Sequence, residues 1–588
     1  METYYTIEKH TQILIALMKF HGVRKVVASP GTTNICLVAS LQSDPYFEMY
    51  SSVDERSAAF IACGLAAESG EPVAITCTGA SASRDYAPGL TEAYYRKLPV
   101  LAITATQHLG RVGTGYSQVV DRSSQMKDMV MESVLVDCVY TKEDEWACGV
   151  SINKALIALR KNGGGPAHIN LVTTYNKDFS VRELPKVKGI NYISSLSQMP
   201  SLDHYRKIAI LVGNHDKWKI ELQQSVDEFC ERYNAVVLEY HACNYKGKYG
   251  VNFALINNMS KFYIEELRTA SLVIYIGGIP RYLSGMDKDL CEMWRVNPDG
   301  MIRDPERILT KVFAMGEQDF FDYYNNKKEN DKHNSEYARL WQEQYNEIIA
   351  QVPELPFSNV WVAQNTISKL PDRCVLHMAG SNTARAWNFF KMPRGVECYS
   401  NDGTMGIDGQ VSALLGESLA APDRLHFGVV GDLTFFYDMN SIGNRHVGKN
   451  IRLIVINNGV GAEFKIYSHP AYRFGEEGSP FMAAEGHYGH KSPDLLRHYS
   501  QDLGFEYMCA SNKEEYLENL DRFLTPEVTD KPMFFEVFTD YHDESQAIYD
   551  MNHIVQNVKP DAKDMAKGVV KSVIGEKGVK AAKKLLGK

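Results

Sequence analysis

The sequence lacks closely spaced cysteines: its 11 cysteines are scattered singly, and no CxxC pair occurs among them. Structural zinc sites and disulfide scaffolds both draw on such clusters, so this pattern argues against structural zinc and favours a reducing compartment. No stretch approaches the roughly 18 apolar residues of a transmembrane helix. The N-terminal METYYTIEKHTQIL also lacks the basic and apolar regions of a signal peptide. We therefore expect a cytoplasmic protein.

Basic charge is scarce as well. The formal net charge of −9 gives no support for nucleic-acid binding, which needs a basic surface. The exception is a tail, residues 551–588, whose segment 559–588 holds nine lysines against three acidic residues. Apolar residues recur there at helical spacing, so an amphipathic helix on an anionic membrane surface is one interpretation. A solvated terminal helix or a disordered tail is the other.

The remaining composition is that of a globular protein, with 44% hydrophobic and 23% charged residues. A chain of 588 residues is too long for one hydrophobic core. Short apolar runs alternate with helical patterns, which predicts three consecutive α/β domains with parallel sheets, at residues 1–185, 190–345 and 355–550. The strand candidates include VRKVVAS (23–29), PVAITCT (72–78), PVLAITA (99–105), KIAILVG (207–213), SLVIYIGG (271–278) and MFFEVF (533–538).

Two further strand candidates end in oxygen-bearing side chains. Residues 426–431 (HFGVVG) are followed by Asp432, and residues 451–456 (IRLIVI) are followed by Asn457 and Asn458. If a crossover helix joins these strands, Asp432 and Asn458 lie at neighbouring carboxyl ends of one sheet, where open α/β sheets bind ligands. Two hard oxygen ligands suit Mg²⁺ better than any soft metal. We therefore expect a magnesium site there.

Four segments rich in glycine or small residues accompany this candidate metal site. Taken singly, each fits a packing role, because glycine-rich turns precede many helices and an acidic pair at a helix start suits the helix dipole. In combination with Gly431-Asp432 and Asn458 they are more specific. The segments are SPGTTN (29–34), VDERSAAFIACGLA (53–66), TGASASRDYAPGLTEAYY (78–95) and YSNDGTMGIDGQVSALLG (399–416).

Together these motifs resemble those of the thiamine-diphosphate-dependent 2-oxoacid decarboxylases and carboligases, over about residues 5–185 and 355–550. Within that family, the chain is similar above all to the menaquinone-pathway 2-succinyl-5-enolpyruvyl-6-hydroxy-3-cyclohexene-1-carboxylate synthases. The resemblance implies a pyrimidine-binding, a central and a diphosphate-binding domain. The motifs that carry it are PG (30–31), DERSAAF (54–60), SNDGTMGIDG (400–409), GDL (431–433) and FFEVFTDYHDES (534–545).

The resemblance implies thiamine diphosphate and Mg²⁺ as cofactors. Glu55 matches the catalytic glutamate that hydrogen-bonds the aminopyrimidine ring. Asp432, the Asn458 side chain and the Val460 carbonyl match the ligands of the metal, which grips the diphosphate. The central block has no glycine-rich dinucleotide fingerprint, so we expect no FAD.

A bulky apolar side chain must press between the two cofactor rings, and Met405 and Ile407 are both candidates for it. Sites of this family lie between subunits, so Glu55 would serve cofactor held by a partner chain. A homodimer or a homotetramer is therefore implied. Gly403, Gly431 and Leu433 complete the implied cofactor-binding set.

The resemblance also assigns the substrate pocket. Ser381 and Arg385 match positions that contact the donor-derived carboxylate in the menaquinone-pathway synthases, and Gln118 matches a glutamine of the same pocket. An arginine fork binds a carboxylate bidentately, which suits this role. The alternatives are an ordinary surface arginine and a solvated loop glutamine.

Three positions depart from the family pattern. Thr33, Gln107 and Asp402 stand where cations would face substrate carboxylates. An unpaired buried carboxylate costs on the order of several kcal/mol, which disfavours isochorismate as the acceptor. The cofactor chemistry would then be kept and the substrate changed. The candidate substrate-binding residues are Thr32, Thr33, Gln107, Gln118, Ser381, Arg385 and Asp402.

The leading hypothesis is a thiamine-diphosphate- and Mg²⁺-dependent transferase or lyase. It would decarboxylate a 2-oxoacid and transfer the acyl anion equivalent to a polar acceptor. One alternative is simple decarboxylation with release of an aldehyde. Another is a non-catalytic relative that acts as a binding subunit, against which the intact Glu55, Asp432 and Asn458 argue.

Overall fold

The computed structural model describes residues 2–257, 265–280, 283, 286–327, 335–487 and 491–554. The chain divides into two compact units, one from residues 1–200 and 292–316, and the other from 201–291 and 317–588. Residues 555–588, most of the predicted basic tail, lie outside the described residues. Within the described ranges, no helix has the length and apolar character that crossing a membrane requires.

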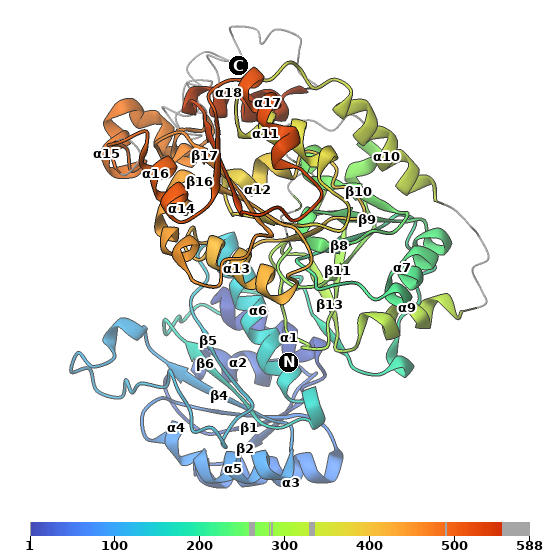
Figure 1. Ribbon diagram of the computed structural model, residues 1–588. Coiled ribbons are helices and arrows are strands. Elements are labelled where there is room, and N and C mark those ends of the chain that lie inside the picture. The colour runs from blue at the N-terminus through green and yellow to red at the C-terminus, as the bar shows by residue number, and fades with distance from the viewer. Residues whose placement is uncertain are drawn as a thin grey trace, which may run out of the picture. The chain divides into compact units, whose positions relative to one another are not determined.

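The first unit is built on a six-stranded parallel sheet (Figure 1). Three of its inner strands, Val73–Cys77, Val100–Thr106 and Ala167–Val172, are buried along their whole length because helices cover both faces. In spatial order the strands are β2 (Glu48–Ser51), β1 (Lys25–Ala28), β3 (Val73–Cys77), β4 (Val100–Thr106), β6 (Ala167–Val172) and β5 (Glu132–Val136). The helices are α1 (Lys9–Phe20), α2 (Ile35–Ser43), α3 (Glu55–Ser69), α4 (Ala82–Asp85), α5 (Ala87–Arg96) and α6 (Lys142–Ala158).

Successive side chains of these strands pack into two separate hydrophobic cores, one on each face of the sheet. Val26 packs in a cluster with α1 and α6, whereas the next residue, Val27, packs in a cluster with α3 and α5. This is the two-residue period of a strand buried on both faces. Helices α3 and α5 approach so closely that a Cβ added to Gly89 would lie 2.4 Å from the Ala59 Cβ. Small residues therefore set the spacing of this helix layer.

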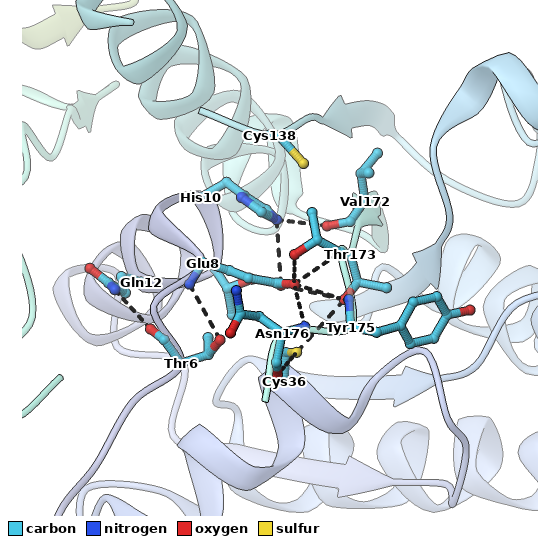
Figure 2. A network of polar contacts seen from close by, with 12 residues as sticks. Thr6, Glu8, His10, Gln12, Cys36, Cys138, Val172, Thr173, Tyr175 and Asn176 are labelled. Atoms are coloured by element: carbon cyan, nitrogen blue, oxygen red, sulfur yellow. Dashed lines mark hydrogen bonds and ion pairs between the residues drawn. The ribbon is translucent and has the colours of Figure 1, made fainter. Parts of the chain in front are cut away.

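A buried carboxylate joins the start of α1 to the carboxyl end of β6 (Figure 2). Glu8 accepts hydrogen bonds from the Thr173 hydroxyl at 3.1 Å and from the Thr174 backbone and hydroxyl, both at 2.8 Å. Burial opposes its ionisation, but these bonds and the nearby His10 lower the pKa of Glu8 below its ordinary value. The charged network therefore fixes two elements that are far apart in the sequence.

The strands of the central domain are divided between the two units. All pairings within each group are parallel. The first unit contains β7 (Asn191–Ile193), β12 (Glu292–Val296) and β13 (Leu309–Phe313). The second contains β8 (Ile208–Val212), β9 (Ala235–Glu239), β10 (Gly250–Asn252) and β11 (Leu272–Ile276), with helices α7 (Ile220–Tyr233), α8 (Phe253–Asn257), α9 (Glu317–Asn325) and α10 (Glu336–Ile349).

A third parallel sheet forms the rest of the second unit. Its strands, in spatial order, are β15 (Glu397–Tyr399), β14 (Val375–Met378), β16 (His426–Gly431), β17 (Ile451–Asn457), β19 (Met533–Phe538) and β18 (Glu506–Ala510). Its helices are α11 (Asn359–Thr366), α12 (Asn382–Trp387), α13 (Gln410–Ala420), α14 (Asp432–Tyr437), α15 (Ser479–Met482), α16 (Leu495–Asp502), α17 (Lys513–Phe523) and α18 (Tyr541–Asn552).

The three parallel-sheet α/β domains confirm the predicted fold class. The predicted domain boundaries stay predictions. One detail differs: the connection from β16 to β17 contains only the six-residue α14 and a 3-10 turn, where a crossover helix was expected. Asp438 follows the end of α14, and its carboxylate accepts hydrogen bonds from the Ser412 backbone and hydroxyl and from the Ser441 hydroxyl, each at 2.6 Å.

Candidate active site

A loop after β17 closes around Asp432. Strands β16 and β17 are parallel neighbours with Gly431 opposite Ile456, so the residues that follow both strands meet at one sheet edge. Asp432 begins α14 and is 4% exposed, and its Oδ2 accepts a 2.9 Å hydrogen bond from the Gly459 backbone. The structure therefore brings Asp432 and the 457–460 loop together, as the strand spacing predicted.

The two asparagines of this loop have different contacts. Asn457 turns into the sheet, where its Nδ2 donates a 2.7 Å hydrogen bond to Oε1 of the buried Glu536. Asn458 keeps its side chain at the loop, where Oδ1 accepts from the Val460 backbone at 3.3 Å. Asn458 is therefore the asparagine available in the turn that contacts Asp432.

The donor set at this edge fits a hard divalent cation. Burial raises the pKa of Asp432 to about 7, although the backbone amides of Leu433 and Gly459 oppose that shift. A carboxylate that has lost its hydration is stabilised in the charged form by a cation. Oxygen atoms of Asn458 and Val460 belong to the same turn, and an oxygen-only donor set suits Mg²⁺. The residues present therefore fit the implied metal.

The glycine-rich loop 400–409 is anchored by the start of α13. The buried Gln410 donates a 2.6 Å hydrogen bond from Nε2 to the Gly406 carbonyl. A Cβ at Gly406 would lie 2.4 Å from Asp408 Oδ1, so the Asp408 carboxylate would have to move to admit one. The preceding Met405 has a φ of +52° and a side chain that is 47% exposed. A left-handed backbone at a long apolar residue is costly, which indicates a functional position.

The other residues predicted around the cofactor lie at the same edge of the third sheet. Gly431 precedes α14 directly, and Leu433 is its second residue and partly buried. Gly403 is exposed with open space beside it, whereas Ile407 is partly buried. Asp402 lines a cavity at the ends of β8 and β14.

Ser381 and Arg385 both hold an acidic side chain that the sequence pattern did not reveal. Glu463 lies in a 3-10 turn, Ala462–Lys465, directly after the candidate metal loop. Arg385 binds it bidentately, with Nη1 2.9 Å from Oε2 and Nη2 3.0 Å from Oε1. The Ser381 hydroxyl donates a further bond of 2.7 Å to Oε2. The predicted carboxylate-binding pair is therefore engaged by a carboxylate of the chain itself.

The electrostatics of this cluster favour the ionised glutamate. Burial opposes ionisation of Glu463, but the hydrogen bonds from Arg385 and Ser381 and the charge of Arg385 outweigh it and lower the pKa of Glu463. The only signal in the sequence is an acidic residue five positions after Asn458 in NNGVGAEF. Nothing in the spacing pairs it with an arginine 78 residues earlier.

The predicted site residues of the first unit follow the carboxyl ends of β2, β1 and β4, which belong to one parallel sheet. Thr32 is exposed after β1, whereas Thr33 is buried. The Thr33 hydroxyl lies 2.7 Å from the Thr78 hydroxyl and accepts a 3.1 Å bond from the Gly79 backbone. Thr33 therefore bridges the loops after β1 and β3.

Glu55 is the first residue of α3 and is partly buried. Asp54 caps this helix by accepting a 3.0 Å hydrogen bond from the Ser57 backbone. Burial, with a smaller contribution from the charge of Glu55, raises the pKa of Tyr86 well above its ordinary value. Glu55 thus lies within electrostatic reach of a buried tyrosine beside the end of β3.

A cation that the motifs did not reveal lies beside Gln107. Arg111 donates a hydrogen bond from Nη1 to Oε1 of Gln107, and its guanidinium carbon is 4.7 Å from the ring centroid of Tyr116. Gln118, on the same loop, is exposed and has a φ of +64°. Arg111 therefore carries positive charge beside Gln107, after the carboxyl end of β4, where the sequence predicts no cation.

The predicted residues thus fall into two sets, each brought together within one compact unit. The first unit holds Thr32, Thr33, Glu55, Gln107 and Gln118, and the second holds Ser381, Arg385, Asp402, Gly403, Met405, Ile407, Gly431, Asp432, Leu433, Asn458 and Val460.

Comparisons with known proteins cover nearly the whole chain. A family model described as "Thiamine pyrophosphate enzyme, N-terminal TPP binding domain" matches residues 8–126. The chain is 32% identical over 568 residues to a 2-succinyl-5-enolpyruvyl-6-hydroxy-3-cyclohexene-1-carboxylate synthase of Phocaeicola vulgatus, covering 94% of this chain and 99% of the relative. A synthase of the same name from Bacteroides fragilis is 31% identical over 577 residues, with 94% and 100% covered.

A solved structure also aligns along most of the chain. It is a thiamine diphosphate-dependent 4-hydroxybenzoylformate decarboxylase of Rhodococcus jostii, 14% identical, and the match covers 90% of this chain and 99% of that one. Its TM-score is 0.40, a value at which the likeness carries no argument. The two sequence relatives carry the assignment.

Proposed function

Because the chain belongs to the thiamine-diphosphate enzyme family that contains the 2-succinyl-5-enolpyruvyl-6-hydroxy-3-cyclohexene-1-carboxylate synthases, we propose that it is a Mg²⁺-dependent carboligase. It would decarboxylate a 2-oxoacid and transfer the resulting acyl anion equivalent to a polar acceptor. The observation that carries this proposal is the buried Asp432, which accepts a hydrogen bond from the loop that follows the neighbouring strand β17.

The metal and the diphosphate would be held by the second unit. Asp432, the Asn458 side chain and the Val460 carbonyl would bind Mg²⁺, and Gly431 and Leu433 would line the diphosphate. The left-handed backbone and the half-exposed side chain of Met405 favour it over Ile407 as the residue between the cofactor rings. When bound, thiamine diphosphate supplies the electron sink for loss of CO₂.

Glu55 would hydrogen-bond the aminopyrimidine from the first unit. Its place at the first turn of α3 puts the carboxylate near the positive end of the helix dipole, at the edge of the sheet where the ring would be held. The proposed assembly is a homodimer or homotetramer in which Glu55 serves cofactor bound by the partner subunit.

The acceptor would differ from isochorismate. The uncharged Thr33 bridges two loops and offers no cation to an acceptor carboxylate. The Arg111 guanidinium beside Gln107 is already bound to that glutamine and stacked on Tyr116. This supports a polar acceptor with less negative charge than a dicarboxylate.

The test is an assay of the purified full chain with thiamine diphosphate and Mg²⁺ against a panel of 2-oxoacids. Released CO₂ identifies the donor, and mass spectrometry of mixtures with polar acceptors identifies the product. Glu55→Gln should lower turnover by more than about 100-fold. Glu68→Gln, an exposed glutamate on the same helix, is the matched control and should leave turnover unchanged.

Three outcomes separate the candidate functions. A new adduct with an acceptor supports carboligation, whereas free aldehyde in every mixture favours simple decarboxylation. If calorimetry detects no binding of thiamine diphosphate with Mg²⁺, the catalytic proposal fails and a binding subunit remains.

A further inference from the structure

Both Nη atoms of the Arg385 guanidinium bind acceptors of the same chain. Two of its nitrogens bind the Glu463 carboxylate at 2.9 and 3.0 Å, and Nη1 also lies 2.6 Å from Asn382 Oδ1. The Ser381 hydroxyl donates a further hydrogen bond of 2.7 Å to Glu463 Oε2. A bidentate, charge-assisted pair of this kind is the strongest class of side-chain hydrogen bonding.

The pair lies at the carboxyl ends of parallel strands, the edge at which open α/β sheets bind ligands. Ser381 and Arg385 belong to the segment that follows β14, and Glu463 belongs to the segment that follows β17, so both come from carboxyl strand ends. Their side chains are 32% exposed for Arg385 and 28% for Glu463. Ser381 also has a φ of +60°, a costly conformation that aims its hydroxyl at the carboxylate. The cluster is therefore accessible and held in place.

We propose that Glu463 determines donor specificity: it neutralises Arg385 from within the chain and so selects 2-oxoacids without a second carboxylate, such as pyruvate, over dicarboxylic ones, such as 2-oxoglutarate. This inference rests on the proposed function, because it names the donor class of the same site.

Charge is the physical reason for the selection. A second carboxylate on the donor has two ways to meet Arg385. In the first, the donor carboxylate displaces Glu463, which then loses its cationic partner in a half-buried position. In the second, the donor carboxylate lies beside Glu463, and the two anions share Arg385. Both ways weaken binding. Since a hydrogen bond to a charged group changes affinity by roughly ten- to a hundredfold, the discrimination should be of that size.

The decisive variant is Glu463→Gln, which keeps the size of the side chain and an acceptor oxygen but removes the negative charge. Glu463→Met removes the charge in a second way and serves if the glutamine variant folds poorly. The matched control is Glu506→Gln. Glu506 forms an equally bidentate pair with Arg522, at 2.8 and 2.6 Å, but it lies at the amino end of β18, on the opposite edge of the sheet.

Two measurements are made on each holoenzyme with thiamine diphosphate and Mg²⁺. The first is the ratio of kcat/KM for pyruvate and 2-oxoglutarate, followed by CO₂ release. The second is the affinity for glutarate, a dicarboxylate without a reactive keto group, compared with butyrate by calorimetry. Glu463→Gln should shift the kcat/KM ratio toward 2-oxoglutarate and tighten glutarate binding, each by about tenfold or more, without tightening butyrate binding. The Glu506→Gln control should change neither quantity.

The two measurements separate the failure of this inference from the failure of the proposed function. If wild type and both Glu463 variants bind glutarate equally, the pair is only a structural bridge and the inference is overturned. A wild-type preference for 2-oxoglutarate overturns it as well. A gain in glutarate affinity without CO₂ from any donor supports the charge assignment of Glu463 and rejects the proposed catalysis.

Discussion

At the scale of single residues, the pKa values of two carboxylates in the candidate site, those of Asp432 and Glu463, shift in opposite directions although burial opposes ionisation of both. Burial opposes the charged form of both Asp432 and Glu463, but Glu463 has Arg385 as a partner, whereas Asp432 accepts hydrogen bonds from backbone amides. The pKa of Asp432 is raised as a result, and that of Glu463 is lowered. The first pattern is that of a carboxylate that awaits a cation, and the second that of one already paired.

Removal of the Asp432 carboxylate should abolish stabilisation by the cofactors. A ligand present at 100 times its dissociation constant stabilises the folded state by about 2.7 kcal/mol, so wild type should melt at a higher temperature with thiamine diphosphate and Mg²⁺. Asp432→Ala should lose this increase in Tm, and EDTA should remove it from wild type. Asp521→Asn, an exposed aspartate on α17, should keep it. An undiminished shift in Asp432→Ala would exclude Asp432 as a metal ligand.

Glu8 should make stability depend on pH. Its folded-state pKa is lowered, so the carboxylate contributes stability above its unfolded pKa of about 4.3, and this stability is lost as the pH falls through the folded value. Glu8→Gln should lower stability at pH 7 by about 1–3 kcal/mol, because buried donors lose a charged acceptor. Its loss of stability as the pH falls below about 5 should also be smaller than that of wild type.

Thermal unfolding at several pH values checks this, with the exposed Glu183→Gln as control. Parallel curves for wild type and Glu8→Gln would contradict the assignment of the acid-sensitive step to Glu8.

At the scale of elements, the contact between α3 and α5 is set by glycine. Gly89 meets Ala59 with no room for a Cβ, whereas Gly64, on the exposed side of α3, has open space around it. Gly89→Leu should therefore destabilise the protein by about 1–3 kcal/mol through overpacking. Gly64→Ala should stabilise it by up to about 1 kcal/mol, since alanine favours helix. Equal melting temperatures for the two variants would show that the helix layer yields to the added volume.

Elements also show how far the sequence predicts the site. Asp432 and Asn458 were placed correctly because each follows an apolar strand, and the meeting of neighbouring strand ends follows from the order of a parallel sheet. Short edge strands such as β2 and β15, of four and three residues, carry too little apolar pattern to be recognised. The bonds of Thr33 to Thr78 and of Arg385 to Glu463 join different loops, which no local period encodes.

At the scale of the whole molecule, the proposed sharing of active sites between subunits can be tested by complementation. Glu55→Gln and Asp432→Ala should each be inactive alone. If Glu55 serves cofactor bound by the partner, a mixed dimer has one intact site and one site with both defects. Random mixing of equal amounts should then restore about one quarter of wild-type activity, because half the dimers are mixed and each has one working site.

Co-expression with two different affinity tags allows the mixed species to be purified and assayed. Activity that stays at the level of the single variants would show that Glu55 and Asp432 act on the same chain's cofactor.

The internal salt bridge of Glu463 also has an evolutionary consequence. A single nucleotide change converts a glutamate codon to one for glutamine, alanine or valine, and each of these replacements would release the positive charge of Arg385 toward incoming molecules. A preference for doubly acidic substrates would thus arise by deletion of a charge rather than by acquisition of one. A single mutation of this chain would therefore change its substrate preference, while the fold and the cofactor-binding residues stay the same.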